Sequence, residues 1–169
     1  GGGGYPMDIA ISKFSPDASQ LLYSTYLGGS DNEQPHSMVL SGNDELFVFG
    51  RTYSSDFPVT SGAYDVTYNG FSDIIISKFN ASGTALLAST FIGGSDEDAV
   101  NISASYYSQS SLKYNYGDDA RGEIVLDNAG NCCVAACTRS FDFPVTAGAY
   151  QTAFGGIQDG CLFSMNSAL

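Results

Sequence analysis

The feature that most constrains the fold is an internal repeat. The phrase DFPVTSGAY at 56–64 returns as DFPVTAGAY at 142–150 with a single Ser-to-Ala change. A second stretch, 8–30, matches 73–95 without gaps at an offset of 65 residues. Because a fixed period is typical of repeat architectures, the chain is expected to be built from similar units that stack on one another.

The offsets predict the boundaries of these units. The DFPVT phrase recurs after 86 residues, and the difference from 65 measures a 21-residue insertion in the second copy, near 97–121. The opening GGGGYPMD has no signal-peptide pattern, so the chain is expected to begin inside a longer protein. The expected parts are the end of a preceding link (1–7), a first unit (8–72), a second unit with the insertion (73–158) and the first strand of a third unit (159–169).

Each unit carries four strand signals separated by turn residues. In the first unit the signals are IAISKF, LLYSTYLG, SMVLS and LFVFGRT, and Gly42-Asn43-Asp44 predicts a hairpin turn between the last two. Four antiparallel strands followed by a long link are typical of a β-propeller blade. We therefore expect an all-β fold with about two and a half blades of a larger propeller. A β-solenoid is the main alternative, but it expects one short rung per repeat.

Composition and charge narrow the range of partners. The 20 Gly, 11 Tyr and 11 Phe residues favour short strands joined by tight turns. The net charge of −12 argues against nucleic acid or an anionic membrane surface as a partner, since both attract clustered Lys and Arg. No stretch approaches the roughly 18 apolar residues of a transmembrane helix, so membrane insertion is not expected.

Several motifs in fixed order point to a known family. D-x-x-x-S-K-F, L-L-x-S-T-Y-L-G-G-S, I-V-L-D-x-x-G-N and D-F-P-V-T-x-G-A-Y resemble the SBBP-type repeat over nearly all of 8–169, apart from the insertion. The resemblance implies a seven-bladed β-propeller in a large bacterial secreted or cell-surface protein, often from gliding or type IX-secreting bacteria and often beside adhesion-like domains. The family has no established catalytic residues. The resemblance therefore implies architecture and an extracellular location, not a reaction.

The DFPVT phrase is interpreted as a structural joint. Proline fixes its own φ and holds the preceding Phe in extended geometry, while the Asp can accept backbone N–H groups across the turn. A catalytic signature would need a base or nucleophile repeated nearby, and none recurs. The joint residues are Asp56, Phe57, Pro58, Asp142, Phe143 and Pro144.

Acidic residues on two glycine-rich turns, 28–33 and 93–98, are weak candidates for a Ca²⁺ site. Their carboxylates supply the oxygen ligands that calcium prefers, but the spacing does not fit an EF-hand loop. Solvated turn acids are the competing interpretation, and no cofactor is required. The candidate ligands are Asp31, Glu33, Asp96, Glu97 and Asp98.

The insertion is the candidate binding surface. It is rich in Tyr and Ser, and tyrosine combines a large contact area with a hydrogen-bonding tip. Long loops are often functional, although a decorative excursion packed on its own blade is an equal alternative. The candidate contact residues are Tyr106, Tyr107, Tyr114 and Tyr116.

The four cysteines leave two interpretations open. Cys133 and Cys137 share a strand face about 13 Å apart, which is too far for a disulfide between them. Buried apolar packing explains at least two of the cysteines, because they replace residues such as Leu46 and Phe47 of the first unit. In an oxidising compartment, Cys161 is a candidate for an inter-blade disulfide with Cys132, Cys133 or Cys137.

These observations predict a non-catalytic, extracellular structural or adhesive module of a larger secreted or cell-surface protein. Its expected partners are other blades of the same propeller, neighbouring protein subunits or a surface glycan. One alternative is an enzyme, a hydrolase or lyase, whose site in the central channel is completed by blades outside this stretch. Another is a subunit of a surface filament or secretion assembly. The two units carry near-equivalent residues, which favours the structural role.

Overall fold

The computed structural model describes residues 6–100 and 122–169, and within these ranges the chain forms strands and no helix. The expected all-β class is therefore confirmed. Every strand pair is antiparallel. The strands are β1 (Ile9–Phe14), β2 (Leu21–Leu27), β3 (Glu33–Leu40), β4 (Leu46–Thr52), β5 (Asp73–Phe79), β6 (Leu86–Ile92), β7 (Gly122–Leu126), β8 (Cys132–Thr138) and β9 (Asp159–Met165).

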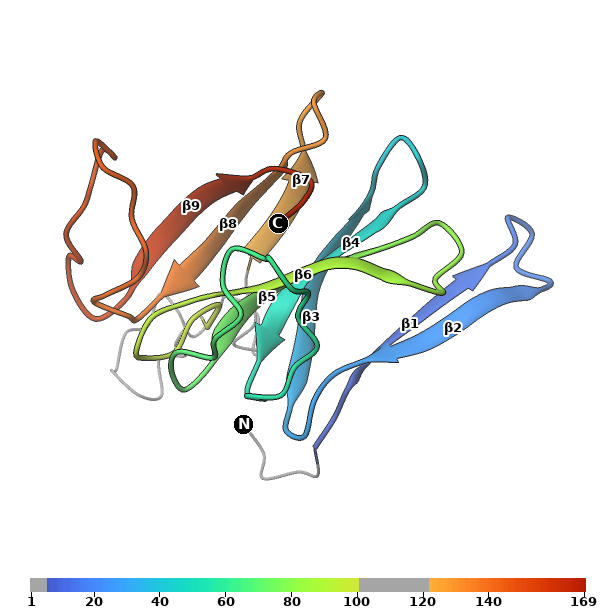
Figure 1. Cartoon of the computed structure of the whole chain (residues 1–169), viewed down its shortest axis with the longest axis horizontal. Coiled ribbons are helices and arrows are strands. Elements are labelled where there is room, and N and C mark those ends of the chain that lie inside the picture. Colours follow the sequence, from blue (N-terminus) through green and yellow to red (C-terminus); the bar gives the residue numbers. More distant parts are fainter. Residues whose placement is uncertain (1–5, 101–121) are drawn as a thin grey trace, which may run out of the picture.

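These strands form three sheets that follow one another in chain order (Figure 1). The first sheet is β1-β2, the second is β3-β4-β5-β6, and the third is β7-β8-β9. Each sheet is a meander in which consecutive strands are neighbours. The described part of the chain contains no helix that could span a membrane.

The sheets are out of phase with the units expected from the sequence. The second sheet takes β3 and β4 from the first unit, 8–72, and β5 and β6 from the second unit, 73–158. The expectation that each unit forms its own four-stranded blade is therefore corrected. A periodic pattern defines the length of the repeat but not where a sheet begins, because any starting point along the period gives the same matches.

The same shift changes the role of the link that contains DFPVT. This link, 53–72, leaves β4 and returns to β5, and the ends of these two strands are paired through Thr52 and Asp73. It is an excursion within one sheet, and not the route from one sheet to the next. The short Gly-Gly-Ser turn after β2 makes that crossing instead.

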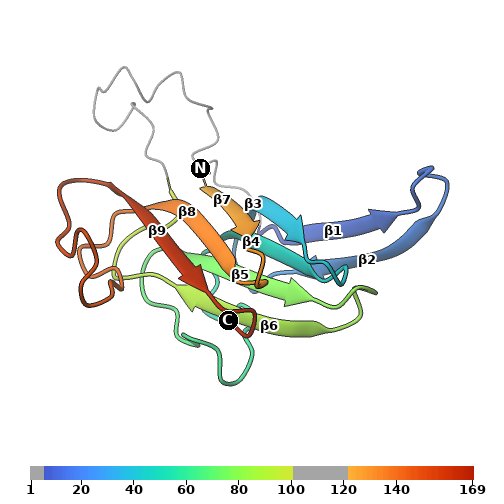
Figure 2. The ribbon, with the colours of Figure 1, turned by 90° about the horizontal axis from the view of Figure 1, so that it is seen from above.

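The second sheet is packed on both faces. One apolar cluster joins it to the first sheet and includes Ile11, Val48 and Ile75. Another joins it to the third sheet and includes Ile76 and Val134. Strand β3 also contacts β7, so the first strands of the second and third sheets lie together (Figure 2).

Burial follows this stacking. Strand β5 is buried at nearly every position, as expected for a sheet covered on both faces, whereas β1 and β9 alternate between covered and exposed residues. Tyr26 on β2 and Leu162 on β9 are 77% and 85% exposed. The outer faces of the first and third sheets are thus uncovered in the described residues.

Candidate functional site

The recurring polar residues gather at the two junctions between sheets. At each junction, the turn that enters a sheet meets the end of that sheet's second strand and the start of its link. The first junction cluster contains Gly29, Ser30, Glu33, Thr52, Ser54 and Asp56. The second contains Gly94, Ser95, Asp98, Thr138, Ser140 and Asp142.

A buried carboxylate lies at the centre of each cluster. Glu33 is only 3% exposed and accepts hydrogen bonds from the hydroxyls of Thr52 and Ser54, both at 2.6 Å. The backbone N–H of Gly29 donates to its other oxygen at 3.1 Å. These donors compensate for the loss of water around a buried acid.

The second junction repeats this arrangement with a shorter acid. Asp98 is fully buried, and its Oδ2 accepts the Gly94 N–H at 2.8 Å and the Ser140 hydroxyl at 2.9 Å. The Thr138 side chain also hydrogen-bonds to this carboxylate. Burial raises the pKa of Asp98, and these hydrogen bonds oppose that effect.

The aspartate of DFPVT closes the outer side of each cluster. Asp56 Oδ1 accepts the Ser30 N–H at 2.8 Å and the Ser30 hydroxyl at 2.9 Å. Asp142 Oδ1 accepts the same two groups of Ser95 at 2.8 and 3.0 Å. The bonds from the backbone N–H groups lower the pKa of both aspartates. Both aspartates accept backbone N–H groups, as the sequence suggested. The donors, however, lie in the Gly-Gly-Ser turn that enters the sheet and not in the turn of the DFPVT phrase itself.

The other joint residues pack differently in the two sheets. Phe57 is buried at 3% exposure, whereas Phe143 is half-buried. The prolines that follow them, Pro58 and Pro144, are half-buried as well. The phrase therefore acts as a joint in each sheet, and the aromatic side chain is fully covered in only one of them.

The paired glycines recur because a side chain would not fit. A Cβ on Gly28 would lie 2.4 Å from Asp8 Oδ1, and one on Gly93 would lie 2.3 Å from Asp73 Oδ1. A Cβ on the following glycine, Gly29, would lie 2.5 Å from the Cβ of Ser54, with the same contact in the second copy. The turn thus packs its backbone directly against the polar cluster.

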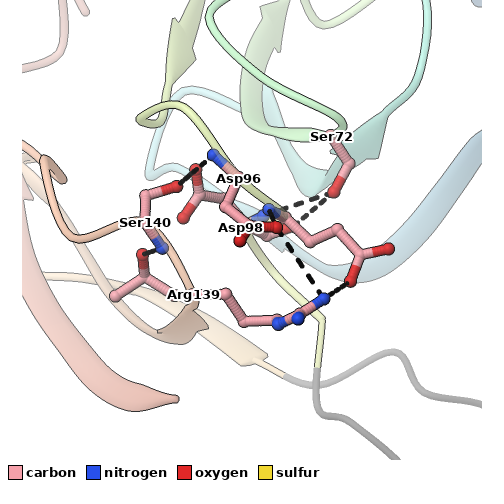
Figure 3. Close-up of polar contacts among 7 residues, drawn as sticks. Ser72, Asp96, Asp98, Arg139 and Ser140 are labelled. Carbon is pink, nitrogen blue, oxygen red and sulfur yellow. Dashed lines mark hydrogen bonds and ion pairs between the residues drawn. The ribbon is translucent and has the colours of Figure 1, made fainter. Parts of the chain in front are cut away.

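The second junction has an ion pair that the first lacks. Arg139 hydrogen-bonds to the Glu97 carboxylate, and its Nη1 lies 3.7 Å from Asp96 Oδ1 (Figure 3). The corresponding residues of the first junction are Tyr53, Asn32 and Asp31. Ser140 accepts the Asp96 N–H at 3.0 Å, so the ion pair adjoins the cluster.

This geometry shows what the five calcium candidates do. Glu33 and Asp98 accept hydrogen bonds inside the clusters, Asp96 and Glu97 pair with Arg139, and Asp31 accepts the N–H of the next residue. In residues 6–100 and 122–169, no group of three or more His, Cys, Asp or Glu side chains could hold a metal ion. The carboxylates that the sequence suggested as ligands thus receive protein donors.

Two fully buried carboxyls lie together on one side of Gly93. The Gly93 Cβ position lies 2.3 Å from Asp73 Oδ1 and 2.8 Å from Asp98 Oδ2. Asp73 accepts the Asn69 N–H at 2.8 Å, but Oδ1 of both acids lacks a hydrogen-bond partner among the described residues. Burial, and then the charge of Asp98, raises the pKa of Asp73 to about 7.

Sequence reasoning did not single out Asp73 as a site residue. The sequence does contain a signal for it, because an aspartate recurs at the start of the equivalent strand or directly before it, at Asp8, Asp73 and Asp159. The link supplies a backbone donor to two of them, since Gly155 N–H donates to Asp159 at 2.6 Å as Asn69 does to Asp73. The recurring acid is therefore an anchor for the end of the link.

No disulfide joins the four cysteines, all of which lie among the described residues. Cys132 and Cys161 are buried in the apolar cluster between the second and third sheets, while Cys133 and Cys137 are half-buried. Cys161 lies opposite Ala136 in the β8–β9 register, so the disulfide considered from the sequence is not formed. Burial raises the pKa of Cys161 to about 12, which fits a packing role.

The candidate binding tyrosines, Tyr106, Tyr107, Tyr114 and Tyr116, lie outside the described residues. The chain on either side of 101–121 is anchored on β8. The Ala99 N–H donates to the Cys137 carbonyl at 2.8 Å, and Gly122 pairs with Ala136. The insertion therefore interrupts the chain beside the first strand of the third sheet.

A scan against protein-family models finds no match. A search of curated proteins finds no similar one.

Proposed function

We propose that this chain is part of a non-catalytic β-propeller module that serves as a rigid structural or adhesive element of a larger secreted or cell-surface protein. The observation that carries the proposal is the near-identity of the two junction clusters. Both use a Gly-Gly-Ser turn, a buried acid, a Thr, a Ser and an Asp in equivalent positions. A repeated junction of this kind is what a stack of like units requires.

The packing of the sheets supports the propeller architecture. A four-stranded antiparallel meander is the usual blade, and the second sheet has this form. The contact between β3 and β7 fits first strands that line a common axis. The uncovered faces around Tyr26 and Leu162 correspond to faces that are buried at the two junctions, so a further sheet would cover each of them.

The chemistry of the junctions supports a non-catalytic role. A raised pKa such as that of Asp73 is common in active sites. However, Asp73 and Asp98 are fully buried and pack against the backbone of Gly93, so neither carboxyl is exposed at the surface. An enzyme would also gather unlike polar groups from different units, whereas the two clusters carry like groups in like places.

Contacts with a protein or glycan partner are assigned to the tyrosine-rich insertion. Its flanking residues are anchored at Ala99 and Gly122, beside the first strand of the third sheet. Such anchoring suits a display role, in which a stiff frame presents an inserted segment. The extracellular location rests on the motifs that resemble the SBBP-type repeat.

The test is a binding assay on a panel of immobilised glycans, with the release of reducing sugar measured in parallel. We expect saturable retention of the chain without release of sugar. Replacing Tyr106, Tyr107, Tyr114 and Tyr116 by Ser should weaken retention at least about tenfold. Tyr64→Ser and Tyr150→Ser, at exposed link positions, form the matched control and should leave it unchanged.

Three outcomes would overturn parts of the proposal. Sugar release by the unsubstituted chain would favour the enzyme alternative. Absence of retention on every glycan would remove glycan as the partner. Full retention by the fourfold variant would exclude the insertion as the contact surface.

A further inference from the structure

In the described residues, the third sheet has one strand fewer than the second. The place beside β9, where the second sheet has β6 beside β5, is open and is lined by the residues equivalent to those around β6. In the second sheet, β6 lies along β5 and under the 53–72 link. In the third sheet, β9 occupies the place of β5, and the 139–158 link occupies the place of 53–72. The two sheets can therefore be compared position by position at the 86-residue offset.

Strand β6 is held along both of its edges. One edge pairs with β5, and the other bonds to the link. Thr60 N–H donates to the Ser89 carbonyl, and Ser89 N–H donates to the Thr60 hydroxyl, both at 3.0 Å. Phe91 N–H likewise donates to the Asp65 carbonyl at 3.0 Å. The link thus acts as a second neighbouring strand.

Aromatic packing fixes the same strand. Phe91 is 1% exposed, and its ring lies 6.1 Å from that of Phe57 and 6.0 Å from that of Tyr68. Both partners belong to the link. A strand that enters this position is therefore recognised by backbone bonds on two sides and by one aromatic anchor, as in β-strand addition.

In the third sheet the corresponding space is an open groove of about 620 Å³ between β9 and the link. Thr146 and Gln151 line it at the positions of Thr60 and Asp65, and Phe143 and Phe154 at the positions of Phe57 and Tyr68. Among the described residues, no strand lies between the link and β9, and the ring of Phe143 packs against that of Phe163 on β9 with 6.4 Å between the ring centres. The groove is thus lined by link residues equivalent to those that hold β6 in the second sheet.

We propose that this groove binds a single extended strand of the sequence type Leu-Leu-x-Ser-Thr-aromatic-aliphatic-Gly-Gly. Two strands of this chain, β2 and β6, carry that sequence, and β6 lies in the equivalent groove of the second sheet. The occupant is one strand and not a hairpin, because β9 takes one of its edges and the link takes the other. This inference goes beyond the proposed function and does not depend on an adhesive role.

One difference between the grooves refines the expected ligand. In the second sheet the Ser77 and Ser89 hydroxyls form a hydrogen bond at 2.8 Å, as do those of Ser12 and Ser24 in the first sheet at 2.9 Å. In β9 the position of Ser77 is held by Phe163. The bound strand therefore needs only a small residue at the position of Ser89, and its hydroxyl contributes little there.

The experiment measures binding of a synthetic peptide with the sequence of residues 84–96, TALLASTFIGGSD, to the full chain. Calorimetry should show saturable binding at one peptide per chain, and hydrogen exchange should slow in β9 and the 139–158 link. A Phe91→Asp peptide should bind at least about tenfold more weakly, whereas a Ser89→Ala peptide should bind within about twofold.

Protein variants separate the groove from the exposed face of the same sheet. Phe143→Ala and Thr146→Ala should each weaken peptide binding, with folding checked by near-ultraviolet circular dichroism. Val125→Ser, on the exposed face of β7, is the control and should bind as the unsubstituted chain does. If the chain alone forms dimers that the peptide dissociates, the strand is supplied by a second copy, which also supports the groove.

The proposal is wrong if no saturable binding occurs up to about 1 mM peptide, a concentration that would detect even weak complexes. It is equally wrong if a scrambled peptide or the Phe91→Asp peptide binds as well as the original. Protection confined to the exposed face, with β9 and the link unchanged, would show that the peptide adheres elsewhere.

Discussion

At the scale of single residues, the recurring letters of the sequence are explained by contacts across a sheet junction. The glycines of the Gly-Gly-Ser turn are required because Asp73 and Ser140 occupy the space of their side chains in the second copy. The acid that follows is surrounded by hydroxyl and amide donors, which makes its burial tolerable. Small and polar residues thus fix how one sheet is oriented against the next, which apolar packing alone would not do.

A first prediction concerns Asp73. Its folded-state pKa of about 7 lies above its ordinary value of 3.8, so its stabilising effect is present below the ordinary pKa and is lost as pH rises through about 7. The urea midpoint of the chain should therefore fall between about pH 4 and pH 7, and Asp73→Asn should remove much of that fall. The difference at alkaline pH should be on the order of a few kcal/mol.

Asp8→Asn is the matched control, because Asp8 is the equivalent of Asp73 in the first unit but is exposed. Its midpoint should follow that of the unsubstituted chain at each pH. A pH dependence that persists unchanged in Asp73→Asn would show that the buried carboxyl pair does not govern it.

The sequence predicted the members of the junction better than their connections. Repetition marked both copies of the Gly-Gly-Ser turn and of DFPVT as structural, and turn chemistry identified Asp56 and Asp142 as acceptors. It did not show that the turn and the link bond to each other. Ser30 and Asp56 are distant in sequence, and only the pairing of the strands brings them to 2.8 Å.

At the scale of elements, the link after β4 is an outer cover for β6. Its Phe57 packs on Phe91, and its backbone bonds to the edge of β6. The 139–158 link has the same sequence features but faces the open groove. The two links therefore offer a comparison in which the phrase DFPVT-x-GAY is shared and the neighbouring strand is not.

A second prediction follows from this comparison. Phe57→Ala should lower the free energy of unfolding by about 3–5 kcal/mol, because it empties a buried site between link and strand. Phe143→Ala should cost only about 1–2 kcal/mol, because Phe143 is half-buried beside the groove. Urea denaturation of both variants measures the difference, and equal losses would contradict the claim that the groove is an unfilled strand position.

At the scale of the whole molecule, the sheets stack in one direction. Each junction buries one face of an earlier sheet against the opposite face of the next, as the two apolar clusters show. The sequence predicted the all-β class, the strand positions and the period of the repeat. It did not predict the phase, since four strand signals in a row can be divided into sheets at any turn. The 53–72 link was long enough to look like a crossing between blades, and only the pairing of β4 with β5 shows otherwise.

The central claim is that the recurring motifs form the same polar junction twice. Double-mutant cycles test it most directly, with Ser140→Ala and Asp98→Asn at the second junction and Ser54→Ala and Glu33→Gln at the first. The hydroxyl–carboxylate distances are 2.9 and 2.6 Å, so each pair should show a coupling of about 0.5–3 kcal/mol in the free energy of unfolding. Ser140→Ala combined with Glu33→Gln, which joins different junctions, should be additive within about 0.5 kcal/mol. Additive effects within each junction would contradict the account.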